Sequence, residues 1–188
     1  MFATPCTSWS VARNMTNVIR SRSEPWGVRH PVKPFSEKDI KSLELGNKTM
    51  RSTLRLLKLF TKLKIPWALE NPYSSNMWHV PSLKRYWERG VARLAVVDQC
   101  SWNKPWRKRT RILLFNVDDQ DIDALERHQC TGRRICSYSK QAHIQLTGSG
   151  PDGRPMTLHA QEFPIGLSRM LARLLLSDHL HRRATRSS

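Results

Sequence analysis

The segment PWALENP, residues 66–72, decides the fold expected of this chain. We interpret it as a short buried strand that Asn71-Pro72 breaks at once, because a residue before proline is held out of helical geometry. From Asn47 onward, apolar residues recur at a spacing of three to four, which predicts an amphipathic helix that Pro66 ends. Glu70 and Asn71 therefore stand at the carboxyl end of a strand that follows a helix.

Two further strands are predicted outward from this segment. The stretches ARLAVVDQC, residues 92–100, and RTRILLFNV, residues 109–117, are rich in Val, Ile and Leu and too short for helices. Residues 74–90 look like a helical segment interrupted by Pro81 and capped by Gly90. Strands with continuous apolar runs, separated by helices, indicate an α/β fold.

Composition restricts the partners of the chain. Its 188 residues suffice for one domain, and 32 Lys and Arg against 15 Asp and Glu give a net charge of +17. A protein this basic usually binds a polyanion, most often nucleic acid, although a ribosomal-type or merely supercharged fragment fits too. The four cysteines form no disulfide framework, and no apolar run approaches a membrane span. Although an N-terminal transit peptide is conceivable, we expect a reduced, soluble, intracellular protein, nuclear or cytoplasmic, not secreted and not membrane-bound.

Three short motifs carry candidate chemistry. In TPCTSWS, residues 4–10, Cys6 follows a predicted strand and opens a polar loop, where a thiol can become reactive; a buried structural cysteine is the alternative. Glu70 is a candidate catalytic carboxylate, or else a cap for a helix starting near Ser74. Arg109 and Arg111 share one face of a strand, which also suits an exposed edge strand or a basic patch.

In this order the motifs resemble the catalytic half of the DNA cytosine-5 methyltransferases. Trp9 and Ser10 occupy the places of the aromatic residue and serine that end the family's proline–cysteine loop, and ENP keeps two residues of its Glu-Asn-Val triplet. Arg109 and Arg111 match Gln-x-Arg-x-Arg, with Arg107 in place of the glutamine. The chain is also similar, from Thr4 to about residue 172, to a divergent branch found in phages and mobile elements.

The resemblance implies a fold and a reaction. The fold would be an incomplete Rossmann-like methyltransferase fold, a partial sheet with flanking helices, plus a loop-rich C-terminal region. Cys6 would add to carbon 6 of a flipped-out cytosine in DNA, Glu70 would hold the ring, and Arg109 and Arg111 would orient it. S-adenosylmethionine would be the methyl donor.

The resemblance also implies a division of the chain. Residues 1–127 would form a partial catalytic domain, 128–161 a loop-rich target-recognition region, 162–178 a C-terminal helix and 179–188 a disordered basic tail. The family's glycine-rich turn and acidic residue, which bind the methyl donor, have no counterpart here. We therefore expect a fragment with little activity alone, which a separate chain carrying the cofactor-binding half could complement.

Basic residues near the motifs are candidate DNA contacts, or else side chains that merely solvate a loop. They are Arg13, Arg20, Arg22, Arg29, Arg107 and Lys108. Two other functions stay open: a non-catalytic nucleic-acid-binding protein, and a thiol hydrolase that pairs Cys6 with a histidine.

A metal site in HQCTGRRICSYSKQAH, residues 128–143, has poor spacing. His128, Cys130, Cys136 and His143 are the right residue types for zinc, but five residues separate the cysteines where two to four are usual. We expect no metal on this pattern, and whether these four residues bind one stays open.

Overall fold

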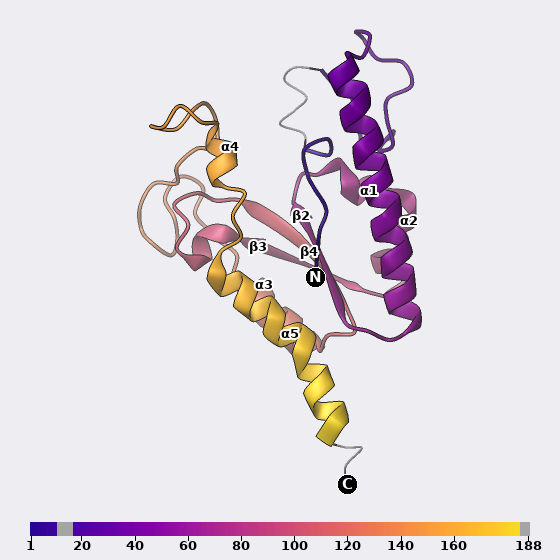
Figure 1. The fold of residues 1–188 in the computed structure, drawn as a ribbon. Coiled ribbons are helices and arrows are strands. Elements are labelled where there is room, and N and C mark those ends of the chain that lie inside the picture. The colour runs from indigo at the N-terminus through magenta and orange to yellow at the C-terminus, as the bar shows by residue number, and fades with distance from the viewer. Residues whose placement is uncertain (11–16, 185–188) are drawn as a thin grey trace. The chain divides into compact units, whose positions relative to one another are not determined.

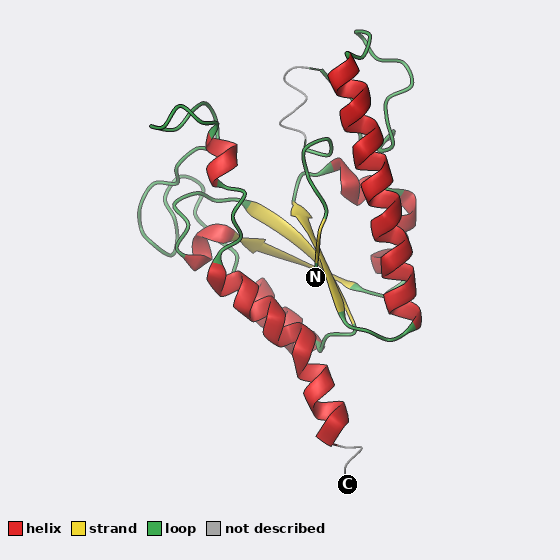
Figure 2. Ribbon diagram, in the orientation of Figure 1, coloured by secondary structure: helices red, strands yellow, loops and turns green. Residues whose placement is uncertain are grey.

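The computed structural model describes residues 1–10 and 17–184 and has a mixed α/β architecture (Figures 1 and 2). Its strands are β1 (Phe2–Ala3), β2 (Trp67–Pro72), β3 (Arg93–Asp98) and β4 (Arg109–Phe115). Its helices are α1 (Glu37–Lys62), η2 (Asn76–His79), α2 (Pro81–Glu88), η3 (Gln99–Trp102), α3 (Asp119–Glu126), α4 (Met156–His159) and α5 (Ile165–Ala184). The strands form one small mixed sheet in the order β1-β2-β4-β3, so the predicted α/β class is confirmed. Among the described residues, no helix is both long and apolar enough to cross a membrane.

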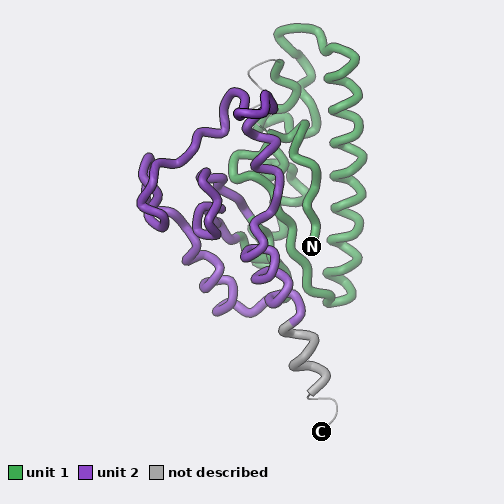
Figure 3. The backbone as a smooth tube through the Cα atoms, turned by 60° about the vertical axis from the view of Figure 1, so that its left-hand side comes forward, with its two compact units in different colours: residues 1–94, 112–116 green, residues 95–111, 117–188 purple. Residues whose placement is uncertain are grey.

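The chain divides into two compact units, coloured separately in Figure 3. The first comprises residues 1–94 and 112–116, and the second comprises residues 95–111 and 117–188. The chain passes from one unit to the other within β3, within β4 and again after Asn116.

The first unit is built on a parallel strand–helix–strand motif. β1 pairs in parallel with β2, with Phe2 opposite Leu69 and Ala3 opposite Glu70. The connection between them contains α1, whose first turn is fixed by a capping box between Ser36 and Asp39. This cap starts the helix ten residues before the predicted Asn47, because polar residues in its first turns hid it from the apolar periodicity.

Aromatic and aliphatic side chains together form the first unit's core. Trp67 stacks on Phe115, with ring centroids 5.6 Å apart, and meets Tyr86 edge-on. Burial is complete at the cluster's centre, whose members include Trp9, Met50, Leu57, Leu69, Met77 and Leu83. The predicted break at Pro81 is also seen: η2 ends before it, α2 begins at it, and Gly90 follows α2 with φ +64°.

The second unit combines regular helices with a long irregular segment. α5 buries Leu167, Leu171 and Leu174, and α3 buries Ile122 and Leu125. Residues 127–161 contain one helical turn, α4, and two isolated bridges, as expected of a loop-rich region. α5 runs to Ala184, six residues into the segment predicted as a tail, and residues 185–188 lie outside the described residues.

Two candidate functional sites

The first site is the loop that carries Cys6. The loop leaves β1 and closes into a tight turn, in which the Cys6 carbonyl accepts hydrogen bonds from the N–H groups of Trp9 (2.9 Å) and Ser10 (2.8 Å). Cys6 is half-buried, whereas the other three cysteines are buried. Cys6 is thus the most exposed of the four cysteines.

The loop is fixed to the strand that carries Glu70 and to the turn after it. Asn71 Nδ2 donates to the Thr4 carbonyl at 2.8 Å, and Asn76 N–H donates to the Trp9 carbonyl at 2.9 Å. Because β1 and β2 are parallel, their carboxyl ends share one edge of the unit. The structure thereby brings the Cys6 loop and the Glu70–Asn71 pair to the same edge.

Glu70 is buried, with 7% of its surface exposed, and it lies within β2 rather than after it. The strand runs from Trp67 to Pro72, so it ends at the predicted Asn71-Pro72 break. A proline is tolerated at the end of a strand, where its missing N–H leaves no ladder bond unmade. The following 3-10 helix is capped by Ser75, which accepts from the Met77 N–H, so Glu70 is not its cap.

Arg20 supports the loop from inside the protein. Only 1% of its surface is exposed, and its guanidinium lies 3.7 Å from the centroid of the Trp9 ring. It donates to the carbonyls of Ser8 (3.0 Å) and Pro25 (2.6 Å), and it makes further bonds to the Ser8 hydroxyl, Leu43 and Asn47. Burial lowers the pKa of Arg20 to about 10. The prediction that Arg20 contacts DNA is wrong, because its donors are used within the fold.

The two arginines of the third motif lie in the second unit, at the start of β4. Arg109 is exposed and its Nη2 donates to Gln129 Oε1 at 3.5 Å, while Arg111 is half-buried. They alternate with the buried Thr110, so they share one face of the strand as predicted. Cys6 and Glu70 come together in the first unit, and Arg109 and Arg111 in the second.

The other predicted DNA contacts differ in their surroundings. Arg22 and Arg29 are exposed, and Arg29 forms a loose ion pair with Glu24 at 3.6 Å. Lys108 donates from Nζ to the Ala160 carbonyl at 2.8 Å, and Arg107 is bound to Asp98. Arg13 lies outside the described residues.

A basic groove in the first unit was not predicted from the sequence. A cavity of about 520 Å³ between α1 and α2 is lined by four cations and by Tyr86; the cations are Arg55, Lys58, Arg85 and Arg89. A neighbouring hollow is lined by Arg22, Lys84 and Arg85. The sequence signal for this groove is the recurrence of Arg and Lys every three to four residues in the two segments that form α1 and α2. That these two helices pack against each other could not be deduced from the sequence.

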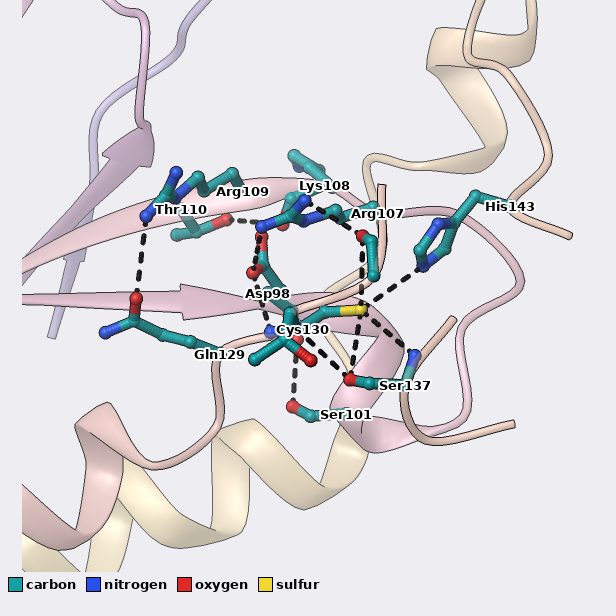
Figure 4. A network of polar contacts seen from close by, with 12 residues as sticks. Asp98, Ser101, Arg107, Lys108, Arg109, Thr110, Gln129, Cys130, Ser137 and His143 are labelled. Carbon is teal, nitrogen blue, oxygen red and sulfur yellow. Dashed lines mark hydrogen bonds and ion pairs between the residues drawn. The ribbon is translucent and has the colours of Figure 1, made fainter. Parts of the chain in front are cut away.

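The second site is a cluster of buried sulfur and imidazole in the second unit. The ligand-capable atoms of Cys100, Cys130, Cys136 and His143 all lie within 4.8 Å of one another, and all four side chains are buried. His143 Nε2 is 3.7 Å from Cys130 Sγ. Figure 4 draws this contact as a dashed line. The cysteines form a buried cluster separate from the aromatic core.

The second site includes three of the residues singled out in the sequence, but Cys100 takes the place of His128. His128 instead stacks on Trp102, with ring centroids 4.3 Å apart. Cys100 lies in η3, directly after β3 and far from the other three along the chain. The chain leaves η3 along β4 and comes back through α3, after which the His128 carbonyl accepts from the Asp98 N–H at 2.9 Å, so local spacing could not identify Cys100.

A short hairpin positions two members of the cluster. His143 N–H donates to the Arg134 carbonyl at 2.8 Å, and Cys136 N–H donates to the Gln141 carbonyl at 2.7 Å. The turn is completed by Lys140, whose φ of +59° is left-handed. The hairpin thus places Cys136 and His143 side by side.

Asp98 binds the backbone of Cys130, and Arg107 binds Asp98 (Figure 4). Asp98 is fully buried, and its Oδ2 accepts from the Cys130 N–H at 2.8 Å and from Arg107 Nη2 at 3.1 Å. Arg107 Nη1 also donates to the Gly132 carbonyl at 3.0 Å. The hydrogen bond to Asp98 raises the pKa of Arg107, and the nearby sulfurs of Cys130 and Cys100 raise it further. Arg107 therefore supports the cluster, which gives it a role inside this unit rather than on DNA.

The sulfurs differ in their proton affinity. Burial raises the pKa of Cys100, and the neighbouring Cys130 and Cys136 raise it further. At Cys136, burial also acts to raise the pKa, but hydrogen bonds from Ser139 and Tyr138 outweigh it and lower the pKa to about 7. At Cys130, bonds from the Ser137 hydroxyl and N–H, both 3.3 Å, likewise outweigh burial and lower the pKa. These donors stabilise thiolates in a buried place.

Comparison of the chain with protein-family models, with curated proteins and with solved structures found no match.

Proposed function

We propose that this chain is a DNA cytosine-5 methyltransferase-like protein whose own residues activate the cytosine ring. The observation that carries the proposal is the parallel pairing of β1 with β2, which puts the half-exposed Cys6 and the buried Glu70 at one edge of the first unit. Ligands of doubly wound α/β sheets bind at the carboxyl ends of the strands. The β1–α1–β2 motif also supports a partial Rossmann-like sheet.

The proposed chemistry begins with the thiolate of Cys6. It forms a bond to carbon 6 of cytosine, and the π electrons of the carbon 5–carbon 6 bond move into the ring, which makes carbon 5 nucleophilic. Glu70 holds N3 and the exocyclic amine and stabilises the charge that builds on the ring. By the resemblance alone, Arg109 and Arg111 of the second unit would orient the base. Carbon 5 then takes up a proton from solvent. Loss of the original carbon 5 proton to solvent returns its electron pair to the carbon 5–carbon 6 bond, and the carbon–sulfur bond breaks to release the Cys6 thiolate. A bound methyl donor would supply a methyl group in place of the solvent proton.

The described residues do not fit S-adenosylmethionine well enough to assign its site. Neither Cys6 nor Glu70 lines any of the cavities described above, and no glycine-rich turn joins a strand to a helix near them within the described ranges. The donor is therefore proposed from the resemblance alone, and a second polypeptide segment would bind it.

The test uses a reaction that needs only this chain's residues. Reversible addition of Cys6 to carbon 6 exchanges the carbon 5 hydrogen of cytosine with solvent, so we expect DNA incubated with the chain in D₂O to gain deuterium at carbon 5. Cys6→Ser is expected to abolish the exchange, and Glu70→Gln to slow it about 100-fold. The matched control is Glu24→Gln, a carboxylate away from β2, which should leave the rate unchanged.

A second experiment traps the adduct. DNA containing 5-fluorocytosine, S-adenosylmethionine and a supplied cofactor-binding half should yield a covalent complex that is lost in Cys6→Ser. The enzymatic proposal would be contradicted if the unaltered chain and Cys6→Ser bound DNA equally well in a salt-sensitive manner and neither exchange nor a covalent adduct were found.

A second candidate function is a non-catalytic nucleic-acid-binding protein, which the basic groove between α1 and α2 favours. Phosphate contacts by Arg55, Lys58, Arg85 and Arg89 would release counterions, so binding should weaken steeply with salt. We expect the double variant Arg55→Gln with Arg85→Gln to lower the slope of log K against log salt by about 2. Lys33→Gln with Lys38→Gln, which removes two exposed lysines outside the groove, is the charge-matched control.

A further inference from the structure

We propose that Cys100, Cys130, Cys136 and His143 form a structural zinc site in the second unit. The proposal concerns residues that the catalytic proposal does not use, so either can fail without the other. It rests on the convergence of four ligand atoms and on the lack of any other buried core in the surrounding segment, residues 127–161.

The geometry suits a tetrahedral ion. Zn–S bonds of about 2.3 Å and Zn–N bonds of about 2.0 Å place neighbouring ligand atoms about 3.5–3.8 Å apart. Cys130 Sγ and His143 Nε2 are already 3.7 Å apart, and every pair of the four lies within 4.8 Å. Closing the remaining pairs around an ion needs movements of about 1 Å or less, which side-chain torsions can supply.

The donor set selects the metal and its role. Three thiolates and one imidazole are soft and borderline ligands that favour zinc, and calcium or magnesium would require oxygen. All four positions are filled by the protein and all four side chains are buried. A closed, buried site of this kind has no place for a reacting water, so its role is structural.

The segment around the site lacks any other core. Between residues 127 and 161, all of which are described, four residues are buried: Cys130, Cys136, His143 and Ala160. Three of these four are proposed ligands. An irregular segment of this length cannot offset its loss of conformational entropy with so little buried apolar surface, and metal bonds supply what the core does not.

The surroundings compensate the charge of the site. Zinc with three thiolates carries a net charge of −1, which is costly to bury without partners. Ser137 donates twice to Cys130 Sγ. Arg107 lies beside the cluster and balances the charge of the buried Asp98, so that this carboxylate adds no further net charge to the site. Asp98 orients the backbone of Cys130 in the manner of an outer-shell partner.

A disulfide is the competing explanation for the three converging thiols. It would join two of the sulfurs and leave the third, together with His143, buried beside it without a role. The presence or absence of a disulfide after purification under reducing and non-reducing conditions therefore enters the test.

The test measures metal content and ligand identity. The full chain, expressed with zinc in the medium, should contain one zinc per chain, and Cys100→Ser or Cys136→Ser should lower the content at least tenfold. His128→Ala and Cys6→Ser, which change residues outside the quartet, should keep one zinc per chain. Cobalt added to the metal-free chain should give the visible absorption bands of a tetrahedral thiolate site.

A measurement on the unaltered chain guards against variants that do not fold. Of its four thiols, only Cys6 should react rapidly with a thiol reagent in the zinc-bound chain, and all four should react once a chelator has removed the ion. A folded chain that contains no zinc and does not take up added zinc chloride overturns the proposal. A disulfide between two of the three cysteines in the folded, metal-free chain, or iron in place of zinc, overturns it as well.

Discussion

Arg20 is a buried cation whose hydrogen-bonding capacity is used by the fold. It joins the Cys6 loop, through Ser8 and the face of Trp9, to Pro25 and to α1 at Leu43 and Asn47. Lysine could not replace it, because a single ammonium lacks the planar fork that reaches several acceptors at once. The residue therefore fixes the loop on which the proposed nucleophile lies.

Replacing this side chain should destabilise the first unit. We expect Arg20→Met to lower the free energy of unfolding by about 3 kcal/mol, because the carbonyls of Ser8 and Pro25 would stay buried without this donor. Urea unfolding followed by tryptophan fluorescence measures this. The exposed Arg22→Met should cost less than about 0.5 kcal/mol, and equal effects of the two substitutions would contradict the role given to Arg20.

In the second site, Gly132 determines the shape of the loop between Cys130 and Cys136, as Arg20 does for the Cys6 loop in the first site. A Cβ at this position would collide with the carbonyl oxygen of Ile135, a backbone atom that cannot easily move. Gly132 also accepts the hydrogen bond from Arg107 between two proposed zinc ligands. Its lack of a side chain lets the loop from Cys130 to Cys136 close.

The change Gly132→Ala should therefore weaken zinc binding. We expect the zinc affinity to fall at least tenfold, measured by competition with a chromophoric chelator, because the loop must open to admit the methyl group. Gly148→Ala is the control, since nothing lies within 4 Å of a Cβ there and only its φ of +71° is unfavourable. Unchanged affinity in Gly132→Ala would separate this loop from metal binding.

α1 shows how a helix begins where its apolar pattern has not yet started. The Ser36 hydroxyl accepts from the Asp39 N–H at 3.2 Å, and the Asp39 carboxylate accepts from the Ser36 N–H at 3.1 Å. Asp39 also accepts from Asn17 Nδ2 at 3.2 Å, which ties the helix start to the segment after residue 16. Local polar chemistry, rather than burial, sets this end of the helix.

The cap can be tested at the level of the helix. Ser36→Ala removes the acceptor and should lower the free energy of unfolding by about 1 kcal/mol. Ser52→Ala, an exposed position inside α1, should be neutral or slightly stabilising because alanine is the better helix former. Chemical denaturation of the two variants side by side compares them, and a larger loss in Ser52→Ala would refute the capping role.

Elements with a strong local signal could be predicted from the sequence, and those formed by distant residues could not. The apolar runs of β3 and β4 and the Pro81–Gly90 limits of α2 fix their positions locally, and the structure confirms them. The buried state of Arg20 and the arrival of Cys100 beside Cys130 depend on how elements pack. The sequence predicts neither feature. Arginine is usually exposed, and a strand and a helix separate Cys100 from Cys130 along the chain.

The same distinction applies to the motifs that the sequence marks as candidate sites. The parallel pairing that unites Cys6 and Glu70 could be expected, since parallel strands joined by a helix bring their carboxyl ends to one edge. The basic groove could not, because it needs α1 and α2 to lie against each other. Net charge predicted a polyanion as partner, and four of the cations that contribute to that charge line this groove.

At the scale of the whole molecule, the two units are stabilised by different means. The first has a continuous core of aromatic and aliphatic side chains, whereas the irregular part of the second buries almost only the proposed ligands. Hydrophobic burial does not depend on a metal, but a site assembled from three thiolates and an imidazole does. The chain should therefore respond to a chelator in one part and not in the other.

Hydrogen exchange followed by mass spectrometry can resolve this response along the chain. After zinc removal under reducing conditions, we expect amides in residues 127–147 to lose protection by at least tenfold, including the hairpin amides of Cys136 and His143. Amides in α1 and β2 should keep their protection, because Met50, Leu57, Trp67 and Leu69 stay buried in a core that contains no ligand. Re-addition of zinc should restore the lost protection, and cobalt should do so as well. Uniform loss across both units would show that the metal stabilises the whole molecule, and no loss anywhere would show that the hairpin is ordered without it.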